Sequence, residues 1–437
     1  NGATYGRRSD WQDLYSIAKK YYEALLADPG NALFHLTDPR GASDKSGRTF
    51  NNPYQYFFEQ MHMDDAIYAD ESIYEYPMQQ GGGNDGRPYS FGRPSSGGSK
   101  AAYPCKSYGQ GRINPAYFYG VFDPNDMRRD VSITMTGSNG KGVEKLIPFV
   151  PNSKAEGGGL TLNKWDENRQ ANPWVAAQRK SGINGPYMRM SEVYLGYAEV
   201  CAALGDVVTG KQYLKTVRER SFPQGLANTD AFIASFGNDL VRAIIEERGF
   251  EYAGEGDRRW TLIRSGYLPE DIKRIKDMTK AMMDGLATKG YYEFENGNII
   301  SAYIWTKLVD AKTIYGHRLT AQCPTDKVND PVLYPGWRGQ KDNWEEMGLN
   351  YGNSAPATNL AIKGLFEIVS EEEAASLESQ GYTKVNWGID LVDNRDEYDK
   401  YLFWDYDYVS APIYLWPFTP NVMAAGGFTN GYGFKQE

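Results

Sequence analysis

The chain has 437 residues, a formal net charge of -9 and an aromatic content of 14%, with 33 Tyr and 10 Trp. No run of Lys and Arg is long enough to follow a phosphate backbone, so a nucleic-acid partner is excluded and an uncharged partner is expected. Three Cys and three His are scattered, which excludes a disulfide framework and the usual spacings of a zinc site. No apolar run approaches the roughly 20 residues of a membrane-spanning helix.

The amino-terminal part combines helices with a long irregular stretch. Apolar residues recur at helical spacing from Trp11, and Pro29 with Gly30 ends the run, which predicts a helix over 11–28. A shorter helix is predicted over 53–63. The alternation at 71–77 is typical of a strand, and the segment 81–111 is predicted as a long loop because Gly, Ser, Pro and Tyr dominate it.

The middle of the chain carries the clearest helices. After an irregular segment with short strands, 115–187, an apolar stripe predicts a helix over 186–201, ended by Gly205. Helices are also predicted over 210–220 and 239–251. Antiparallel helix pairs of this size are the unit of a tetratricopeptide-like solenoid.

The carboxyl-terminal part changes to aromatic-rich loops after about residue 290. Helices are predicted over 355–368 and 371–380, and a strand over 408–416. The expected fold is mainly α, with tetratricopeptide-like helix pairs and a large irregular subdomain of loops and short strands. Within residues 1–437 we expect a loop-rich, ligand-facing region at 64–186, a helix-hairpin region at 187–289 and an irregular region at 290–437.

The segment 246–266, EERGFEYAGEGDRRWTLIRSG, joins a helix end, a glycine-bracketed acidic turn and a second aromatic and basic helix. It resembles the signature of the SusD/RagB-like outer-membrane nutrient-binding lipoproteins. Five further segments resemble parts of this family in the family's order: 70–75, 122–130, 189–199, 217–220, and 414–420 with 430–434.

The resemblance implies a function and a location. Proteins of this family capture glycans or peptides at the outer face of the bacterial outer membrane and deliver them to a SusC-like TonB-dependent transporter. They are not known as enzymes, so non-catalytic binding of an oligosaccharide is expected. A peptide ligand is the alternative within the family, and a carbohydrate-active enzyme is the alternative from another class.

Two departures from the family pattern matter. The segment that resembles 11–26 lies well inside the proteins of this family, behind a lipid-bearing Cys and further helices, so the chain resembles the carboxyl portion of a larger protein. Thr261 stands where the family usually has an acidic residue, and one internal ion pair is therefore expected to be absent.

The charged residues of the helices are predicted to be structural. Opposite charges three or four residues apart are ordinary helix chemistry. We interpret Arg189, Glu192, Glu247, Arg248 and Arg258 as ion-pair residues that hold the helix pairs together. No pair of carboxylates stands out with the spacing that glycoside hydrolysis would need.

No metal or organic cofactor is expected. Asp123, Asp126 and Asp130 could hold a structural calcium ion, although a capped turn explains the same residues.

Aromatic side chains in the irregular segments are the candidate ligand-binding residues. Sugar rings stack on Trp and Tyr and need polar side chains beside them for their hydroxyl groups. The loop 165–174 supplies both kinds. The predicted site consists of Trp165, Trp174, Tyr117, Tyr119, Asn168 and Arg169, and Tyr74, Tyr76 and Tyr89 add further ring faces.

Overall fold

The computed structural model describes most of the chain. The described residues are 9–39, 52–62, 68–82, 90–94, 107–138, 144–151, 157–166, 180, 182–310, 358–402 and 419–427. Two of the predicted site residues with a polar side chain, Asn168 and Arg169, lie outside these ranges, as do Trp174, Tyr89 and the predicted strand at 408–416.

Helices dominate the described part. They are α1 (Trp11–Ala27), α2 (Pro53–Gln60), the π-helical η1 (Tyr117–Val121), α4 (Arg128–Ser132), α5 (Met190–Ala203), α6 (Val207–Glu219), α7 (Thr229–Ala234), α8 (Leu240–Glu251), α9 (Asp257–Ser265), α10 (Leu268–Lys289), α12 (Glu371–Ser379), α13 (Gly388–Asp393), α14 (Arg395–Leu402) and α15 (Pro420–Gly426).

Among the described residues the strands are short and form five small antiparallel sheets. Their orders are β1-β6, β10-β9-β11, β2-β5, β3-β4 and β7-β8. The bounds are β1 (Ser72–Tyr76), β2 (Ile133–Thr134), β3 (Thr136–Ser138), β4 (Glu144–Leu146), β5 (Thr161–Leu162), β6 (Gly185–Arg189), β7 (Tyr291–Glu293), β8 (Ile299–Ser301), β9 (Tyr303–Asp310), β10 (Thr358–Lys363) and β11 (Thr383–Asn386). The mainly α fold with a strand and loop subdomain is thus confirmed.

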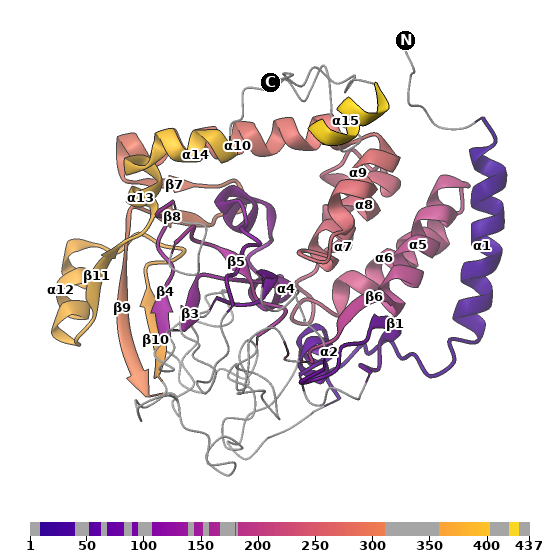
Figure 1. The fold of residues 1–437 in the computed structure, drawn as a ribbon, viewed down its shortest axis with the longest axis horizontal. Coiled ribbons are helices and arrows are strands. Elements are labelled where there is room, and N and C mark those ends of the chain that lie inside the picture. Colours follow the sequence, from indigo (N-terminus) through magenta and orange to yellow (C-terminus); the bar gives the residue numbers. More distant parts are fainter. Residues whose placement is uncertain are drawn as a thin grey trace.

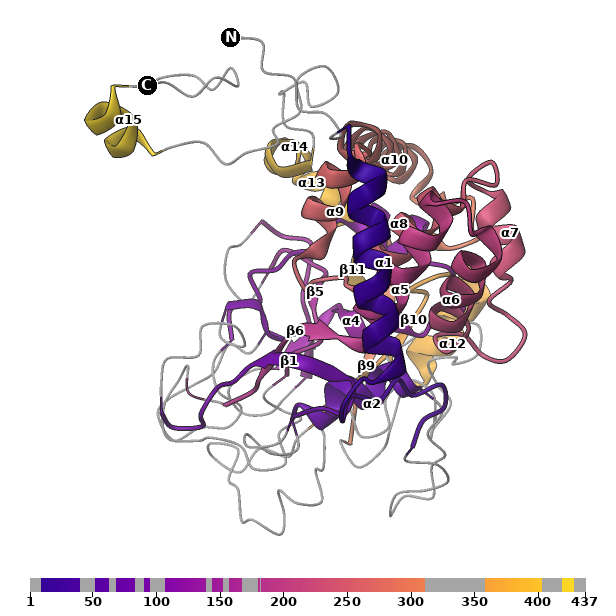
Figure 2. The same cartoon turned by 90° about the vertical axis from the view of Figure 1, so that its right-hand side faces the viewer.

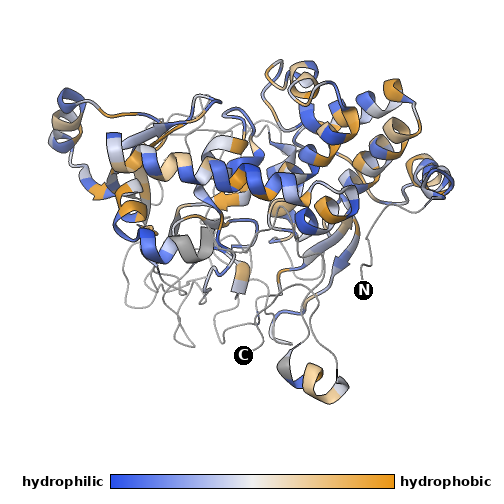
Figure 3. Cartoon of the chain, turned by 90° about the horizontal axis from the view of Figure 1, so that it is seen from above, coloured by the Kyte–Doolittle hydropathy of each residue, from blue (hydrophilic) through white to orange (hydrophobic). Residues whose placement is uncertain are grey.

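Helices α1 and α5–α9 gather at one side of the molecule together with the β1-β6 sheet, and the other sheets lie toward the opposite side, beside α12 and α13 (Figure 1). In Figure 1, α1 is outermost, α5 and α6 lie next to it, and α10 runs across the top. Figure 2 shows α1 in front of α5 and α6, in agreement with its packing on α5. The helices carry both hydrophilic and hydrophobic residues (Figure 3), as expected for amphipathic helices that bury one face.

The pair α5 and α6 forms the predicted helix hairpin. Gly205, at φ +91°, ends α5 in the left-handed region, and the carboxylate of Asp206 accepts a hydrogen bond from the backbone N–H of Thr209 to begin α6. A Cβ on Gly210 would lie 2.9 Å from the carbonyl oxygen of Ala198, so this glycine permits the close approach of the two helices.

Two sequence predictions are wrong. Within the segment 355–368, predicted as a helix, residues 358–363 form the strand β10, which pairs with β9 and buries Ala361 and Ile362, and residues 364–368 are irregular. Pairing with a distant strand overrides local periodicity here. The helix predicted from residue 186 begins at Met190, because residues up to Arg189 form β6 against β1.

Candidate functional site

The described residues of the predicted aromatic platform, Trp165, Tyr117 and Tyr119, do not form an exposed surface. Trp165 is 2% exposed and packs with Leu162 and Ile183 in a small hydrophobic cluster. Tyr119 is fully buried, and its hydroxyl accepts a hydrogen bond of 2.8 Å from the indole N–H of Trp387. A ring enclosed on both faces cannot stack on a sugar. The assignment of Trp165 and Tyr119 as ligand-contacting residues is therefore wrong.

Tyr117 has a structural contact as well. It is half-buried in η1, and its hydroxyl donates a 2.8 Å hydrogen bond to the carbonyl oxygen of Gly249 in α8. Burial raises the pKa of Tyr117 above its usual value, which keeps the hydroxyl protonated as a donor. This tyrosine ties η1 to α8, and its prediction as a platform residue is not supported by its position.

Exposed tyrosines lie instead on the sheet of β1 and β6. Tyr74 is 54% exposed, Tyr76 is 56% exposed and Tyr187 is 75% exposed. The rings of Tyr74 and Tyr187 meet edge to face, with their centroids 5.6 Å apart. We call these three residues the tyrosine surface. The sequence pointed to Tyr74 and Tyr76 only as additional ring faces, and it did not point to Tyr187.

The strand geometry explains why these rings face outward. Glu75, between the two tyrosines of β1, is 1% exposed, and its carboxylate accepts hydrogen bonds from the Ser72 hydroxyl, from the backbone N–H of Ala69 and from the Asn184 amide. Because successive side chains of a strand point to opposite faces, an inward Glu75 places Tyr76 outward. The pairing of β1 with β6 is irregular between Ser72 and Glu75, and Ile73 and Tyr74 are both exposed there.

A buried ion-pair network fixes this sheet to the helices. The guanidinium of Arg189, at the end of β6, donates to the carboxylates of Glu71 at 2.9 Å and of Glu251 in α8. Arg220 bonds the same two carboxylates, at 2.6 Å and 2.8 Å. All four side chains are at most 2% exposed.

The charges of this network compensate one another. Burial alone would raise the pKa values of Glu71 and Glu251, but the neighbouring guanidiniums, Arg220 and Arg189 among them, overcome that effect and hold both pKa values below the usual range. Burial lowers the pKa of Lys164 to about 8, against the opposing effect of Glu255, whose carboxylate lies 2.6 Å from the Lys164 Nζ. The network holds the β1-β6 sheet in a defined position on α8.

The remaining charged residues of the family-like segment also pair within the protein. Arg248 contacts the carboxylates of Glu192 at 2.8 Å and Asp257 at 2.6 Å, and its Nε donates to the hydroxyl of Thr261. Thr261 in turn donates to Asp257. The hydroxyl of Thr261 thus forms hydrogen bonds with Arg248 and Asp257 at the position where the sequence predicted that one ion pair would be absent.

The other predicted ion pairs are present too. Glu247 pairs with Arg128 at 2.7 Å and with Arg218 at 2.9 Å, and Arg258 pairs with Glu246 at 2.7 Å. The predicted structural role of these helix charges is confirmed by their contacts.

The candidate calcium ligands are engaged by other groups. Asp126 forms an ion pair of 2.7 Å with Arg128, and Asp130 lies 3.2 Å from Arg129. The carboxylate of Asp123 accepts a hydrogen bond from the backbone N–H of Asn125. These contacts favour the capped-turn interpretation. Within the described ranges no group of three His, Cys, Asp or Glu side chains could hold a metal ion.

Comparison with known proteins identifies the family. The model of the SusD family matches residues 34–417, and the chain therefore belongs to the SusD family. Among curated proteins, the SusD-like protein P25 of Formosa agariphila is 28% identical over 160 residues, which are 36% of this chain and 26% of that protein.

Several solved structures of similar proteins are from Bacteroides species. A SusD homolog from Bacteroides thetaiotaomicron is 18% identical with a TM-score of 0.42, covering 61% of this chain and 52% of its own. The surface glycan-binding protein A of the same organism, solved in complex with laminarihexaose, is 17% identical with a TM-score of 0.39, covering 60% of this chain and 52% of its own. The chain thus spans about half the length of these structures and a smaller share of the curated relative. No helix within the described ranges is both long and apolar enough to cross a membrane.

Proposed function

We propose that this protein binds a nutrient oligosaccharide without chemical conversion and presents it for uptake. Membership of the SusD family supports the proposal, and the tyrosine surface is the structural observation that carries it. Three tyrosines exposed by more than half on a two-stranded sheet offer flat apolar faces with hydroxyl groups at their rims. Such rings match the CH faces and hydroxyl groups of a sugar.

The ligand is proposed to be neutral. The chain carries a net charge of -9, which repels a polyanionic glycan over the whole surface. A neutral sugar is unaffected by this field, and its binding is expected to depend little on salt.

The cellular setting follows the family. We propose that the protein lies at the outer face of the outer membrane, held by a lipid anchor, with a SusC-like TonB-dependent transporter as the partner that receives the ligand. Trp174, Asn168 and Arg169, outside the described residues, remain proposed contributors to the ligand site, because their loop joins a ring with polar side chains.

A peptide ligand is the second candidate within the family, and a carbohydrate-active enzyme is the third. A peptide binder would rely on backbone hydrogen bonds and would tolerate the loss of a single ring. An enzyme would release reducing ends from its substrate.

A binding screen separates these candidates. The protein is immobilised and exposed to a glycan array and to a pool of short peptides, each at low and high salt. Saturable binding of neutral glycans that is insensitive to salt supports the proposal. Binding that is confined to the peptide pool contradicts it.

A further inference from the structure

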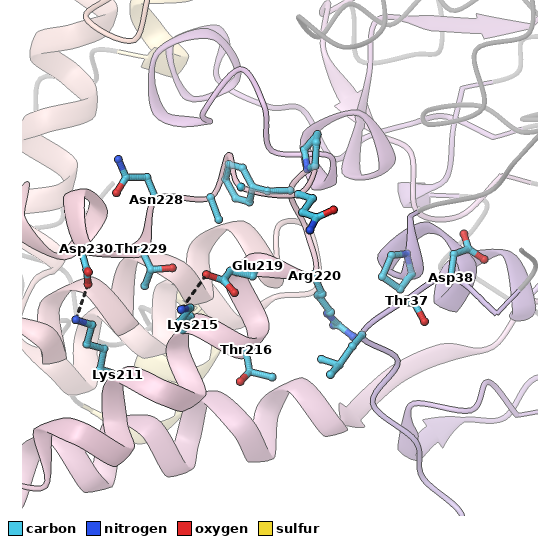
Figure 4. Close-up of a pocket in the computed structure, with 17 residues that line it drawn as sticks. Thr37, Asp38, Lys211, Lys215, Thr216, Glu219, Arg220, Asn228, Thr229 and Asp230 are labelled. Atoms are coloured by element: carbon cyan, nitrogen blue, oxygen red, sulfur yellow. Dashed lines mark ion pairs between the residues drawn. The ribbon is translucent and has the colours of Figure 1, made fainter.

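A cleft of about 970 Å³ lies beside α6, in a part of the helix region that no sequence pattern pointed to. Its walls are the segment 36–38 with Pro53, one face of α6, and the segment 222–230 that leads into α7. Figure 4 shows Lys211, Lys215 and Glu219 of α6 facing the side chains of the 222–230 segment. This volume lies at the upper end of the range of small-molecule sites and exceeds the needs of a single sugar ring.

The charges at the cleft neutralise one another. Lys211 lies 2.5 Å from the carboxylate of Asp230 across the cleft, and Lys215 lies 3.5 Å from Glu219 (Figure 4). Each lysine is therefore matched by an acid. An anionic or cationic ligand would have to break these pairs, whereas a neutral ligand can use their remaining hydrogen-bonding capacity.

A buried hydroxyl without a partner lines the cleft. Thr229 is 5% exposed, and its Oγ1 forms no hydrogen bond in the structure. A buried polar atom without a partner is costly, and most such atoms in native proteins are satisfied. In Figure 4 this oxygen points toward the α6 side of the cleft. A hydroxylated ligand would satisfy it.

The wall that carries Thr229 is held rigidly. The Nε of Arg218 donates a 3.1 Å hydrogen bond to the carbonyl oxygen of Ala227, and its guanidinium lies 4.5 Å above the ring of Phe222. The same guanidinium pairs with Glu247. A pre-formed wall reduces the entropy that a ligand loses on binding.

We propose that this cleft is a second binding site for a neutral oligosaccharide, distinct from the tyrosine surface. The proposal rests on the proposed function, since both sites would take the same class of ligand. The polar side chains of the cleft are hydroxyls, amides and neutralised charges, with Phe222 and Pro223 as apolar lining. No strand contributes to its lining, so the cleft offers no sheet edge for a peptide backbone.

Two substitutions test the cleft. Thr216 lies on the cleft face of α6, and the substitution Thr216→Trp places a large side chain in the cleft. Thr229→Val removes the unpaired hydroxyl while keeping the shape, so folding should be unharmed or slightly more stable. We expect Thr229→Val to weaken binding about fivefold, the equivalent of one hydrogen bond. Thr288→Val, on the exposed face of α10, is the control and should bind as the wild type does.

The probes are laminarihexaose, maltohexaose, cellohexaose and xylohexaose, read by calorimetry and by amide hydrogen exchange. We expect a bound hexaose to slow exchange in both 222–230 and β1-β6, and Thr216→Trp to abolish only the first effect. Slowing confined to β1-β6, or unchanged affinity in both cleft variants, overturns the cleft site and leaves the proposed function standing. If no hexaose binds the wild type, or if only a peptide pool protects 222–230, the cleft proposal and the proposed function are both contradicted.

Discussion

Two arginines of the helical region, Arg189 and Arg258, differ in their exposure and in the carboxylates that they contact. Arg189 is 1% exposed and contacts three carboxylates, those of Glu71, Glu251 and Glu255. Arg258 is 25% exposed, and its partner Glu246 also binds Arg274, at 2.7 Å. A second guanidinium remains in both cases, Arg220 beside Glu71 and Glu251 and Arg274 beside Glu246. The two arginines therefore differ mainly in burial.

This difference predicts that substitution of the two arginines lowers the free energy of unfolding by different amounts. Arg189→Met should lower the free energy of unfolding by about 3 to 5 kcal/mol, the usual cost of breaking a buried ion pair. Arg258→Met should cost about 1 to 3 kcal/mol, because this guanidinium is partly exposed to water. Urea unfolding followed by circular dichroism measures both. Equal losses of unfolding free energy in the two variants would show that the burial of Arg189 does not increase its contribution to stability.

The ion pairs of Glu246 with Arg258 and Arg274 predict that the stability of the protein is sensitive to acid. Burial would raise the pKa of Glu246, but Arg258 and Arg274 lower it from 4.5 to about 2. A carboxylate with a depressed pKa in the folded state stabilises the protein above its unfolded pKa and loses this contribution as pH falls. The free energy of unfolding should therefore decline between pH 4.5 and 2. In Glu246→Gln the decline should be shallower, and an identical pH profile would rule out this carboxylate as a contributor.

Trp165 and Trp260 provide a matched test of burial. Trp165 is 2% exposed in a hydrophobic cluster, and Trp260 is 53% exposed on α9. Trp165→Ala should cost about 3 to 5 kcal/mol of unfolding free energy, and Trp260→Ala should change it by no more than about 0.5 kcal/mol. Thermal and urea unfolding provide the values. A fully stable Trp165→Ala variant with reduced glycan affinity would restore this residue to the ligand site.

At the scale of elements, the sequence predicted those that local patterns determine. The helix hairpin of α5 and α6 was predictable because an apolar stripe and Gly205 agree within one segment. The strand β10 was not, because it exists through pairing with β9, about fifty residues earlier. Whether an aromatic ring is buried or exposed also depends on tertiary packing. The sequence named both Trp165 and Tyr74 as possible ligand-facing rings, but the structure buries Trp165 and exposes Tyr74.

The exposed tyrosines of the β1-β6 sheet provide a test of the proposed ligand site. The triple variant Tyr74→Ala, Tyr76→Ala, Tyr187→Ala removes three exposed rings without opening the core. Stacking is worth about 1 kcal/mol per ring, so the affinity for the glycan identified by the array should fall at least tenfold. Tyr21→Ala, which removes a ring 71% exposed on α1, is the control and should bind normally. Equal affinity in the triple variant and the control would place the site elsewhere.

At the scale of the whole molecule, a helical body carries a sheet whose outer face is aromatic. Helices α5 and α8 are joined by ion pairs such as that between Glu192 and Arg248, and the same α8 anchors the β1-β6 sheet through Glu251. A rigid body of this kind suits capture of a ligand on its surface, since binding residues on a fixed scaffold lose little entropy. The family could be predicted from the sequence because its signature is the segment that builds this body.

Calorimetric titration of the protein with the neutral hexaoses, followed by analysis of the recovered sugar, tests non-catalytic glycan binding most directly. The account predicts saturable heat with at least one hexaose, an affinity nearly unchanged between low and high salt, and sugar recovered at its original length. Binding that requires low salt would contradict a neutral ligand site. Recovery of shortened sugars with new reducing ends, or the absence of binding to every hexaose, would contradict the central claim.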